Sequence, residues 1–392
     1  MNVSDVDALT SPQGRALLAE LAGTAGEDPV ALAARLRRAG HDPALAALAT
    51  TQSRLRAKAA AKFGPRADGL LFTAAGAEQA TRAVVAAEHA RRFAAAGVHR
   101  VADLGCGIGA DSLAFLDAGL DVLPVDADPT TVAVAAHNLG REVRCADVTA
   151  GVVDELGPGD GAWFDPARRT SGGRRLFDPE ATSPPLSFVL ATAARVPATG
   201  AKLAPGLPHE LVPAGAEAQW TSVDGEVVEC ALWCGPLARP GLVRSARVVR
   251  GATAHEIDDV DLPVAPVGPV GEFLHEPDGA VIRSGLVAKV AADLDGRLVD
   301  ETIAYVSTDS SRTSPFTRAF RVLEVMPFGL KPLRARLREL DVGTLTVKKR
   351  GTAVDPDQFR RQLALKGSRT ATIVLTRIAG KQSVLVVEPV TP

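Results

Sequence analysis

The segment Val101-Ala102-Asp103-Leu104-Gly105-Cys106-Gly107-Ile108-Gly109 decides the fold of this 392-residue chain. An apolar strand runs into a glycine-dense turn, and a helix is predicted from Ala110 onward. Glycine suits such a turn because it adopts backbone angles that other residues avoid, and because it lets a ligand approach the bare backbone. The start of the helix offers unpaired N–H groups. The segment therefore predicts a strand–turn–helix unit that binds a ligand.

Short apolar runs alternate with helical segments from residue 98 onward. Strands are predicted at 100–104, 121–125, 143–146, 161–164 and 201–203, and helices at 110–118, 130–139 and 185–195. This alternation is typical of βαβ units in a parallel sheet. Two more strands, at 217–222 and 226–234, are joined by Val223-Asp224-Gly225 and predict an antiparallel edge. The expected fold class is α/β, with a doubly wound Rossmann-like sheet.

Two cofactor classes fit the glycine turn. Gly105, Gly107 and Ala110 satisfy the dinucleotide fingerprint, which keeps an NAD-dependent dehydrogenase open as an alternative. Asp103 argues against it, because a carboxylate at the end of the strand would repel a pyrophosphate. S-adenosylmethionine carries an ammonium and a sulfonium group and no phosphate, so the same carboxylate would attract it. The sequence therefore favours S-adenosylmethionine, bound by a loop that runs from Asp103 to Gly109.

Two acids that follow the next strands are candidates for the rest of the cofactor. Asp126 ends the 121–125 strand region, 21 positions after Gly105, where an acid can accept both ribose hydroxyls. Asp128 lies nearby and is the alternative that caps the following helix instead. Asp147 follows the third strand and is expected either to accept the adenine amino group or to cap a turn.

These residues together resemble the motifs of the class I S-adenosylmethionine-dependent methyltransferases. The run D-L-G-C-G-I-G is similar to their first motif, Asp126 to their second-strand acid and Asp147 to their third-strand acid. The resemblance covers about residues 98–235. It implies that Asp103, Gly105 and Gly107 line the methionine end of the cofactor.

The reaction is expected at Asp165-Pro166-Ala167-Arg168-Arg169, which follows the 161–164 strand. Ligands of such sheets bind outside the carboxyl ends of the strands. The run resembles the D/N-P-P-Y/F/W motif of amino-group methyltransferases, which implies that Asp165 and the carbonyl on the Pro166 side accept the hydrogens of the target amine. Ala167 and Arg168 depart from that motif. Two interpretations of the arginines that bracket 170–173 stay open, a solvated loop and a phosphate clamp; these arginines are Arg168, Arg169, Arg174 and Arg175.

The other segments are expected to form an N-terminal helical region at 1–97, a β-rich connecting region at 236–330 and an α+β domain at 331–392. In the first region, helices are predicted to start at Ser11-Pro12, Asp28-Pro29 and Asp42-Pro43, and a further helix is predicted from Ala74 to Ala96. The last region is predicted to contain a helix to Leu340, a strand at 344–349, a helix that starts at Asp355-Pro356, and strands at 370–378 and 383–388. From Lys331 to Lys381 the chain has 13 Lys/Arg against 4 Asp/Glu, although its overall net charge is only -2. This local surplus indicates a nucleic-acid partner, with ordinary solvated charge as the alternative. The candidate contacts are Lys348, Lys349 and Arg350.

The order of parts resembles the bacterial methyltransferases with a C-terminal THUMP-like domain, and distantly the trimethylguanosine synthases. The likeness rests on Leu71-Phe72-Thr73, on Glu78-Gln79-Ala80-Thr81, and on three runs of the tail, at 347–351, 354–356 and 371–377. It implies RNA binding. The leading hypothesis is therefore an RNA methyltransferase that acts on a base nitrogen. The alternatives are methylation of a protein or small molecule, and a non-catalytic RNA-binding protein with a vestigial pocket.

Hydropathy and cysteine spacing indicate the cellular compartment of the protein and whether it binds a metal ion. Neither a signal peptide nor an apolar run of membrane-spanning length is apparent, so a cytoplasmic protein is expected. The cysteines lack the spacing of a zinc site, and no metal is expected; they are Cys106, Cys145, Cys230 and Cys234.

Overall fold

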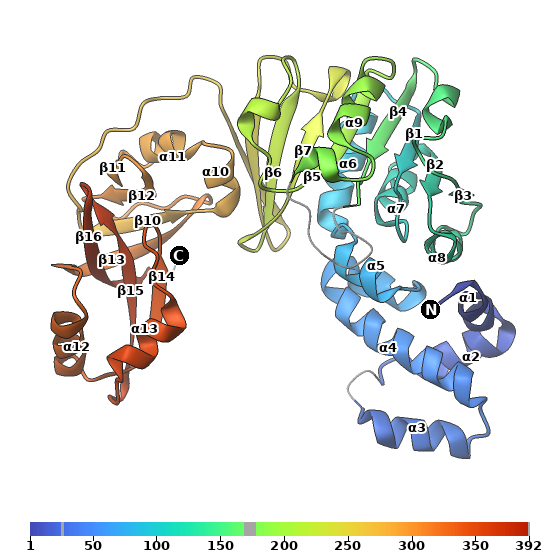
Figure 1. Ribbon diagram of the computed structural model, residues 1–392, viewed down its shortest axis with the longest axis horizontal. Coiled ribbons are helices and arrows are strands. Elements are labelled where there is room, and N and C mark those ends of the chain that lie inside the picture. The colour runs from blue at the N-terminus through green and yellow to red at the C-terminus, as the bar shows by residue number, and fades with distance from the viewer. Residues whose placement is uncertain (25–26, 168–177, 391–392) are drawn as a thin grey trace. The chain divides into compact units, whose positions relative to one another are not determined.

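The structure, a computed structural model, describes residues 1–24, 27–167 and 178–390 (Figure 1). The chain divides into two compact units. One comprises Met1–Leu207 and Ala231–Pro240, and the other comprises Pro208–Cys230 and Gly241–Pro392.

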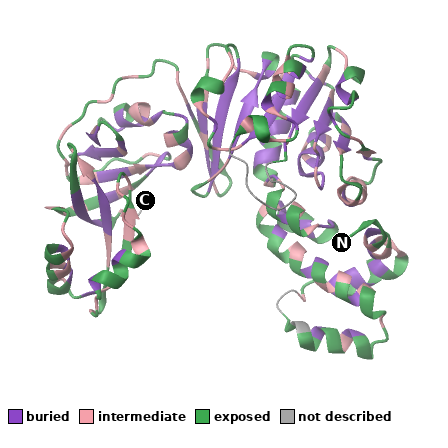
Figure 2. Cartoon of the chain, in the orientation of Figure 1, coloured by how far each residue is buried: buried purple, intermediate pink, exposed green. Residues whose placement is uncertain are grey.

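The first unit contains a parallel sheet with the strand order β3-β2-β1-β4-β5, next to which lies β7. Its strands are β1 (Arg100–Leu104), β2 (Asp121–Asp126), β3 (Arg144–Cys145), β4 (Asp160–Phe164) and β5 (Ala198–Leu203). Strand β7 (Glu226–Trp233) is divided between the two units, and only residues 231–233 of it belong to the first. The helices between them are α7 (Ala110–Asp117), α8 (Pro129–Leu139) and α9 (Leu186–Ala193). Strands β1 and β4 are buried along most of their length, as expected for a parallel sheet covered on both faces (Figure 2). The predicted doubly wound α/β fold is confirmed.

Helices fill the chain before the sheet, as predicted. They are α1 (Val3–Thr10), α2 (Pro12–Glu20), α3 (Pro29–Arg38), α4 (Pro43–Phe63), α5 (Ala74–Gln79) and α6 (Ala83–Ala95), with the 3-10 turn η1 at Gly64–Gly69. The predicted Ser-Pro and Asp-Pro starts are confirmed, because Ser11, Asp28 and Asp42 each accept a hydrogen bond from a backbone N–H of the first turn.

One helix prediction is wrong. A single helix was expected from Ala74 to Ala96, but the chain is extended between α5 and α6, where Ala80 has φ -53 and ψ 140. At the break, the hydroxyl of Thr81 donates to Asp111 at 2.7 Å and accepts from Lys202 at 2.9 Å. These buried contacts come from distant parts of the chain, so helix propensity alone does not reveal the break.

The N-terminal helices share a hydrophobic core with the cofactor loop region. Leu9, Leu36 and Phe72 belong to the same buried cluster as Ile108 and Val134. Hydrogen bonds hold the segment 70–73 on both sides. The Gln52 amide exchanges two bonds with the backbone of Phe72 (2.7 and 2.9 Å). The Asn138 amide accepts from Leu71 N at 2.8 Å and donates to the carbonyls of Leu71 and Ile108 at 3.0 and 2.9 Å.

The second unit contributes β6 (Glu217–Val223), β8 (Arg244–Arg250) and β9 (Thr253–Asp258) to the order β7-β6-β8-β9. The predicted turn between β6 and β7 is confirmed: Asp224 and Gly225 have φ of 51 and 87°, as in a two-residue hairpin turn. Strand β8 runs parallel to β6, and β9 runs antiparallel to β8.

A second sheet follows in this unit, with the order β11-β12-β10-β13-β16-β15-β14. Its elements are β10 (Phe273–Pro277), α10 (Gly279–Arg283), α11 (Val287–Asp293), β11 (Arg297–Asp300), β12 (Ile303–Thr308), β13 (Thr317–Pro327), α12 (Leu330–Glu339), β14 (Val342–Lys349), α13 (Pro356–Leu363), β15 (Arg369–Ile378) and β16 (Lys381–Pro389). Strand β13 pairs with both β10 and β16, so the region before residue 330 and the tail form one sheet. The predicted helix–strand–helix–strand–strand order of the tail is confirmed.

Candidate cofactor and active site

The glycine turn after β1 adopts the left-handed backbone that its sequence predicts. Gly105, Gly107 and Gly109 have φ of 89, 56 and 89°. A Cβ on Gly105 would lie 2.9 Å from the backbone oxygen of Asp165, which leaves no room for a side chain. A Cβ on Gly107 would meet none of the described atoms within 4 Å, so this peptide faces open space. The turn thus presents bare backbone where a ligand can approach.

Asp103 lies at the inner end of this turn with 1% of its surface exposed. One carboxylate oxygen, Oδ2, accepts a hydrogen bond from Ser112 at 2.5 Å, whereas Oδ1 is buried without a partner among the described residues. Burial, and then the nearby charge of Asp111, raise the pKa of Asp103 well above its usual range. A cation brought to Oδ1 would satisfy this atom and stabilise the charged carboxylate. The ammonium group of S-adenosylmethionine fits that requirement.

Asp126 ends β2 directly beside the glycine turn. Its Oδ2 accepts from Gly107 N at 3.0 Å and its Oδ1 from Asp128 N at 3.0 Å. Burial raises the pKa of Asp126 above its ordinary value. Asp128 instead caps α8 by accepting from the N–H groups of Thr130 and Thr131. The two neighbouring acids therefore have different structural roles, and the ribose role of Asp126 stays a prediction.

Asp147 caps a turn after β3. The exposed carboxylate accepts from Thr149 N at 2.8 Å and from the Thr149 hydroxyl at 2.7 Å. These hydrogen bonds lower the pKa of Asp147. The turn-capping alternative is thus what the structure shows for one carboxylate oxygen, and the adenine contact stays a prediction.

Asp165 follows β4 and lies against the glycine turn. Its N–H donates to the carbonyl of Leu104 at 3.2 Å. Its Oδ2 accepts from Lys202 Nζ at 2.7 Å, and the Lys202 side chain is only 5% exposed. Pro166 is buried. The structure thus brings the predicted catalytic residue and the predicted cofactor loop together at the carboxyl end of the sheet.

Lys202 connects Asp165 to a second buried carboxylate through a chain of hydrogen bonds. Lys202 Nζ donates to the Thr81 hydroxyl at 2.9 Å, which donates to Asp111 Oδ2 at 2.7 Å. The other oxygen of Asp111 lies 2.7 Å from His89 Nδ1. Burial opposes ionisation of Asp111, but His89 and then Lys202 outweigh it and lower the pKa of this carboxyl. The network fixes the position of Asp165 from beneath the sheet edge.

Sequence reasoning missed this network. Lys202 is the one charged residue of strand β5, which is buried along its whole length. A charged side chain in such a strand signals a buried partner, so Lys202 had a readable signal. Thr81 lies in the run 78–81 that carries the family likeness, but no local pattern indicates its partners. His89 and Asp111 had no signal, because their partners lie far away in the sequence.

Ala167 explains one departure from the amino-methyltransferase motif. Its N–H donates to the carbonyl of Ser183 at 2.8 Å, and its own carbonyl accepts from Ser183 N at 3.3 Å. A proline at position 167 has no N–H and would lose the first bond. Arg168, Arg169, Arg174 and Arg175 lie outside the described residues.

The three predicted RNA contacts of the tail do not share one environment. Lys348 Nζ lies 2.5 Å from Glu276 Oε2 and 5.2 Å from the centre of the Phe320 ring. Arg350 lies over the Tyr305 ring at 5.2 Å. Lys349 between them is exposed, with Nζ 2.8 Å from the carbonyl of Val354. Only Lys349 of the three is exposed, whereas Lys348 and Arg350 are half-buried.

The strand order and the acidic glycine turn define a class I S-adenosylmethionine-dependent methyltransferase. The chain is 37% identical, over 333 residues, to two uncharacterized S-adenosylmethionine-dependent methyltransferases from two strains of Mycobacterium tuberculosis. These matches cover 83% of this chain and 90% of each relative. The protein belongs to this methyltransferase family, and S-adenosylmethionine is its cofactor.

Other comparisons agree on the architecture. A crystal structure of a putative methyltransferase from Porphyromonas gingivalis has the same fold, with a TM-score of 0.69 and 19% identity over 88% of this chain and 91% of that one. Residues 317–389 match the family model described as THUMP domain-like, and residues 2–59 match a domain of unknown function. The predicted THUMP-like domain is confirmed.

Two kinds of feature are absent from the described residues, a membrane-spanning helix and a metal-binding cluster. None of the helices in 1–24, 27–167 and 178–390 combines the length and apolar character needed to cross a membrane. The same part of the chain holds no group of three or more His, Cys, Asp or Glu side chains arranged for a metal ion.

Proposed function

We propose that this methyltransferase modifies a base nitrogen of RNA, with Asp165 and Pro166 orienting the acceptor. The observation that carries the proposal is the position of the Asp165 carboxylate. It follows β4, its backbone oxygen would lie 2.9 Å from a Cβ added at Gly105, and Lys202 holds one of its carboxylate oxygens at 2.7 Å. A fixed acceptor beside the cofactor loop suits a substrate that presents N–H hydrogens.

The main contribution of the protein to this reaction is to position the acceptor nitrogen against the methyl group. When bound, S-adenosylmethionine supplies a methyl group on a sulfonium that leaves readily. Asp165 and the carbonyl on the Pro166 side accept hydrogen bonds from the target amine, so that the nitrogen lone pair faces the methyl carbon in line. Lys202 keeps Asp165 from turning away. Arg168 and Arg169 follow directly in the sequence and are proposed to contact the substrate backbone.

The rest of the cofactor is assigned in the same proposal. Asp103 and the peptides of Gly105, Gly107 and Gly109 hold the methionine end. Asp126, fixed by Gly107 N, accepts the ribose hydroxyls, and Asp147 contacts the adenine amino group.

Two features support RNA as the substrate. The match at 317–389 is to a THUMP domain-like family, whose name implies RNA binding. The tail carries 13 basic against 4 acidic residues between Lys331 and Lys381, and exposed members include Lys349, Arg361 and Arg369. A phosphate backbone is attracted to such a surface without any need for sequence readout. A cytoplasmic location is part of the proposal, supported by four cysteines that are all free.

Transfer of labelled methyl groups tests the proposal. Total RNA and total protein from a strain that lacks this enzyme are offered separately, with S-adenosylmethionine as donor. We expect label in RNA with the wild type and loss of it with Asp165→Ala, which removes the acceptor oxygen. The matched control is Asp154→Ala, which removes an exposed carboxylate paired with Arg195 and should retain activity. Label in protein alone would replace RNA by the protein alternative, and no label in either would favour a non-catalytic role.

A further inference from the structure

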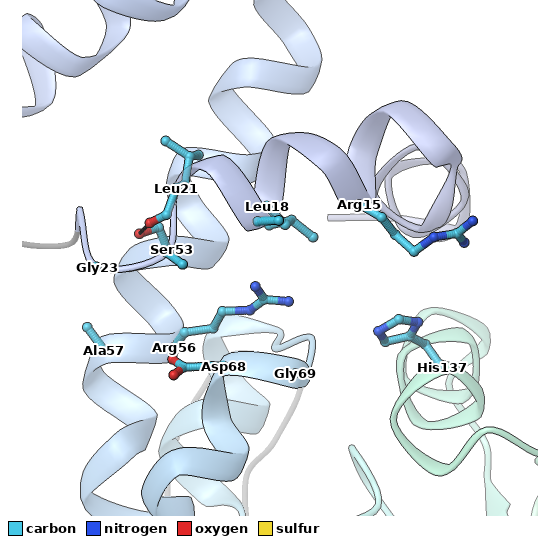
Figure 3. Close-up of a pocket in the computed structure, with 12 residues that line it drawn as sticks. Arg15, Leu18, Leu21, Gly23, Ser53, Arg56, Ala57, Asp68, Gly69 and His137 are labelled. Carbon is cyan, nitrogen blue, oxygen red and sulfur yellow. Dashed lines mark hydrogen bonds between the residues drawn. The ribbon is translucent and has the colours of Figure 1, made fainter.

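A cavity of about 340 Å³ lies among the N-terminal helices of the first unit, separate from the predicted cofactor residues. Its walls come from α2, α4, the turn η1 and α8 (Figure 3). Leu18 and Leu21 form an apolar side. The size lies at the lower end of the range for small-molecule sites.

Three nitrogen-bearing side chains from three helices line this cavity. They are Arg15 of α2, Arg56 of α4 and His137 of α8. In Figure 3, Arg56 and His137 extend toward each other, and Arg15 lies above His137 with its guanidinium turned away from Arg56. Arg15 is exposed, so its guanidinium is able to turn toward the cavity. Asp68 of η1 is the one acidic side chain in the lining. The lining therefore has more positive than negative charge, beside an apolar wall.

The protein uses only part of the hydrogen-bonding capacity of these groups. Arg56 donates through Nε to the carbonyl of Leu70 at 2.9 Å, and Arg15 donates through one amino group to the carbonyl of Thr10. A guanidinium has five N–H donors, so each arginine retains donors for a ligand. Burial lowers the pKa of Arg56, with Asp68 opposing it. Burial also lowers the pKa of His137, a hydrogen bond to Gly69 opposes this, and the charges of Arg56 and Arg15 lower it further. An anion would relieve this accumulation of positive charge.

We propose that this cavity binds a nucleotide, with its phosphate on Arg15 and Arg56 and its base against Leu18 and Leu21. Guanidinium groups bind phosphate oxygens with directed, charge-assisted hydrogen bonds. His137 donates or accepts at the edge of the ligand. The nucleotide is either part of an RNA chain or a free mononucleotide, and only the RNA source rests on the function proposed above.

The cavity is linked to the cofactor loop by a short path. His137 is followed by Asn138, whose amide donates to the carbonyl of Ile108 in the glycine turn at 2.9 Å. Gly69 in the cavity wall directly precedes the segment 70–73, to which Asn138 and Gln52 are hydrogen-bonded. A bound nucleotide would therefore contact the same elements that support the cofactor loop.

Binding of uridine 5′-monophosphate to the full-length protein tests the proposal, with uridine as the probe that lacks phosphate. Excess S-adenosylhomocysteine keeps the cofactor site filled. A 5′-phosphorylated RNA oligonucleotide is measured in parallel. The variants are Arg15→Gln and Arg56→Gln. The matched control is Arg54→Gln, because Arg54 lies on α4 as Arg56 does, is exposed and does not line the cavity.

We expect each cavity variant to lower the binding affinity for the mononucleotide, for the RNA, or for both by about tenfold or more, because each removes a charge-assisted hydrogen bond. Arg54→Gln should bind as the wild type does, and uridine should bind much more weakly than its monophosphate. An effect on RNA alone assigns the site to the RNA chain, and an effect on the mononucleotide alone assigns it to a free nucleotide. Unchanged binding of both probes, in variants that still bind S-adenosylhomocysteine, would overturn the proposal. Methyl transfer to RNA is a separate readout, so failure of the proposed function is distinguishable.

Discussion

Lys202 Nζ lies 2.7 Å from Asp165 Oδ2, and the Lys202 side chain is only 5% exposed. The lysine comes from β5 and the carboxylate from the end of β4, so neighbouring parallel strands supply the pair. In the proposed function, Lys202 acts through Asp165 as a positioning residue.

Replacement of Lys202 by Met should lower kcat by about 100-fold, because a misplaced Asp165 no longer orients the acceptor. The KM for S-adenosylmethionine should change little, and Lys202→Arg should restore part of the rate. The Asp165 side chain is 26% exposed, so loss of its partner should cost about 1–3 kcal/mol of stability, less than in a fully buried pair. The double variant Asp165→Asn with Lys202→Met should recover stability but not kcat. Equal kcat in wild type and Lys202→Met would exclude the positioning role.

The protonation of Asp103 should couple cofactor binding to pH. Because the folded pKa is raised, the cofactor-free protein keeps a proton at pH values where the unfolded chain has lost it, and its stability falls as pH rises through that window. The cofactor ammonium needs the ionised carboxylate, so affinity should rise with pH over the same window and binding should release a proton. Calorimetry in buffers of different ionisation enthalpy measures this release. It should shrink in Asp103→Asn, and an unchanged release there would assign the proton to another group.

Gly105→Ala should abolish cofactor binding, whereas Gly119→Ala should not. Both glycines have positive φ, 89 and 81°, so both alanines carry a backbone cost of about 1–2 kcal/mol. Only at Gly105 would the new Cβ also collide with Asp165, at 2.9 Å, since Gly119 has open space among the described residues. Thermal unfolding and calorimetric titration with S-adenosylmethionine separate the two effects. Similar cofactor affinity in both variants would contradict the close approach of the two loops.

Lys349 and Lys348 should differ in their effect on RNA affinity. Lys349→Gln should weaken RNA binding and reduce the slope of log K against log salt by about 1, as expected for one lost phosphate contact. Lys348→Gln should leave both unchanged and instead cost about 1 kcal/mol of stability, because it loses the Glu276 pair and the Phe320 ring. Filter binding across a salt series measures the RNA affinity of each variant and its dependence on salt. RNA binding without salt dependence in any variant would count against the basic tail as the contact surface.

The sheet could be predicted because its signal is local. Strand β1 was predicted at its observed bounds, and α7 within one residue, since a buried parallel strand is a short apolar run and its helix follows a glycine turn. Strands β8 to β13 were harder to predict, because proline, glycine and aspartate interrupt their runs. The division of the chain at residues 97, 235 and 330 stays a prediction; the family match itself begins at 317, with β13.

The site could be predicted only where a motif carries it. Asp103, the glycines and Asp165 lie together because β1 and β4 are neighbouring strands of one sheet. Lys202 could be recognised as a charged residue in a buried strand, but its proximity to Thr81 and His89 was not predictable, since it depends on how α6, α7 and β5 pack. The tail shows the converse limit: charge counts found the basic region, but Lys348 is engaged by Glu276, 72 positions away.

The hydrogen bonds on both sides of the segment 70–73 restrict which parts of this enzyme can be exchanged in a chimera. Gln52 binds Phe72 from α4, and Asn138 binds Leu71 from α8, so the segment is shared between the leading helices and the catalytic sheet. Thr81 and His89 from the same leading part also reach the carboxylate Asp111. A chimera that exchanges residues 1–97 with those of a distant relative must therefore exchange the matching positions in α7 and α8 as well.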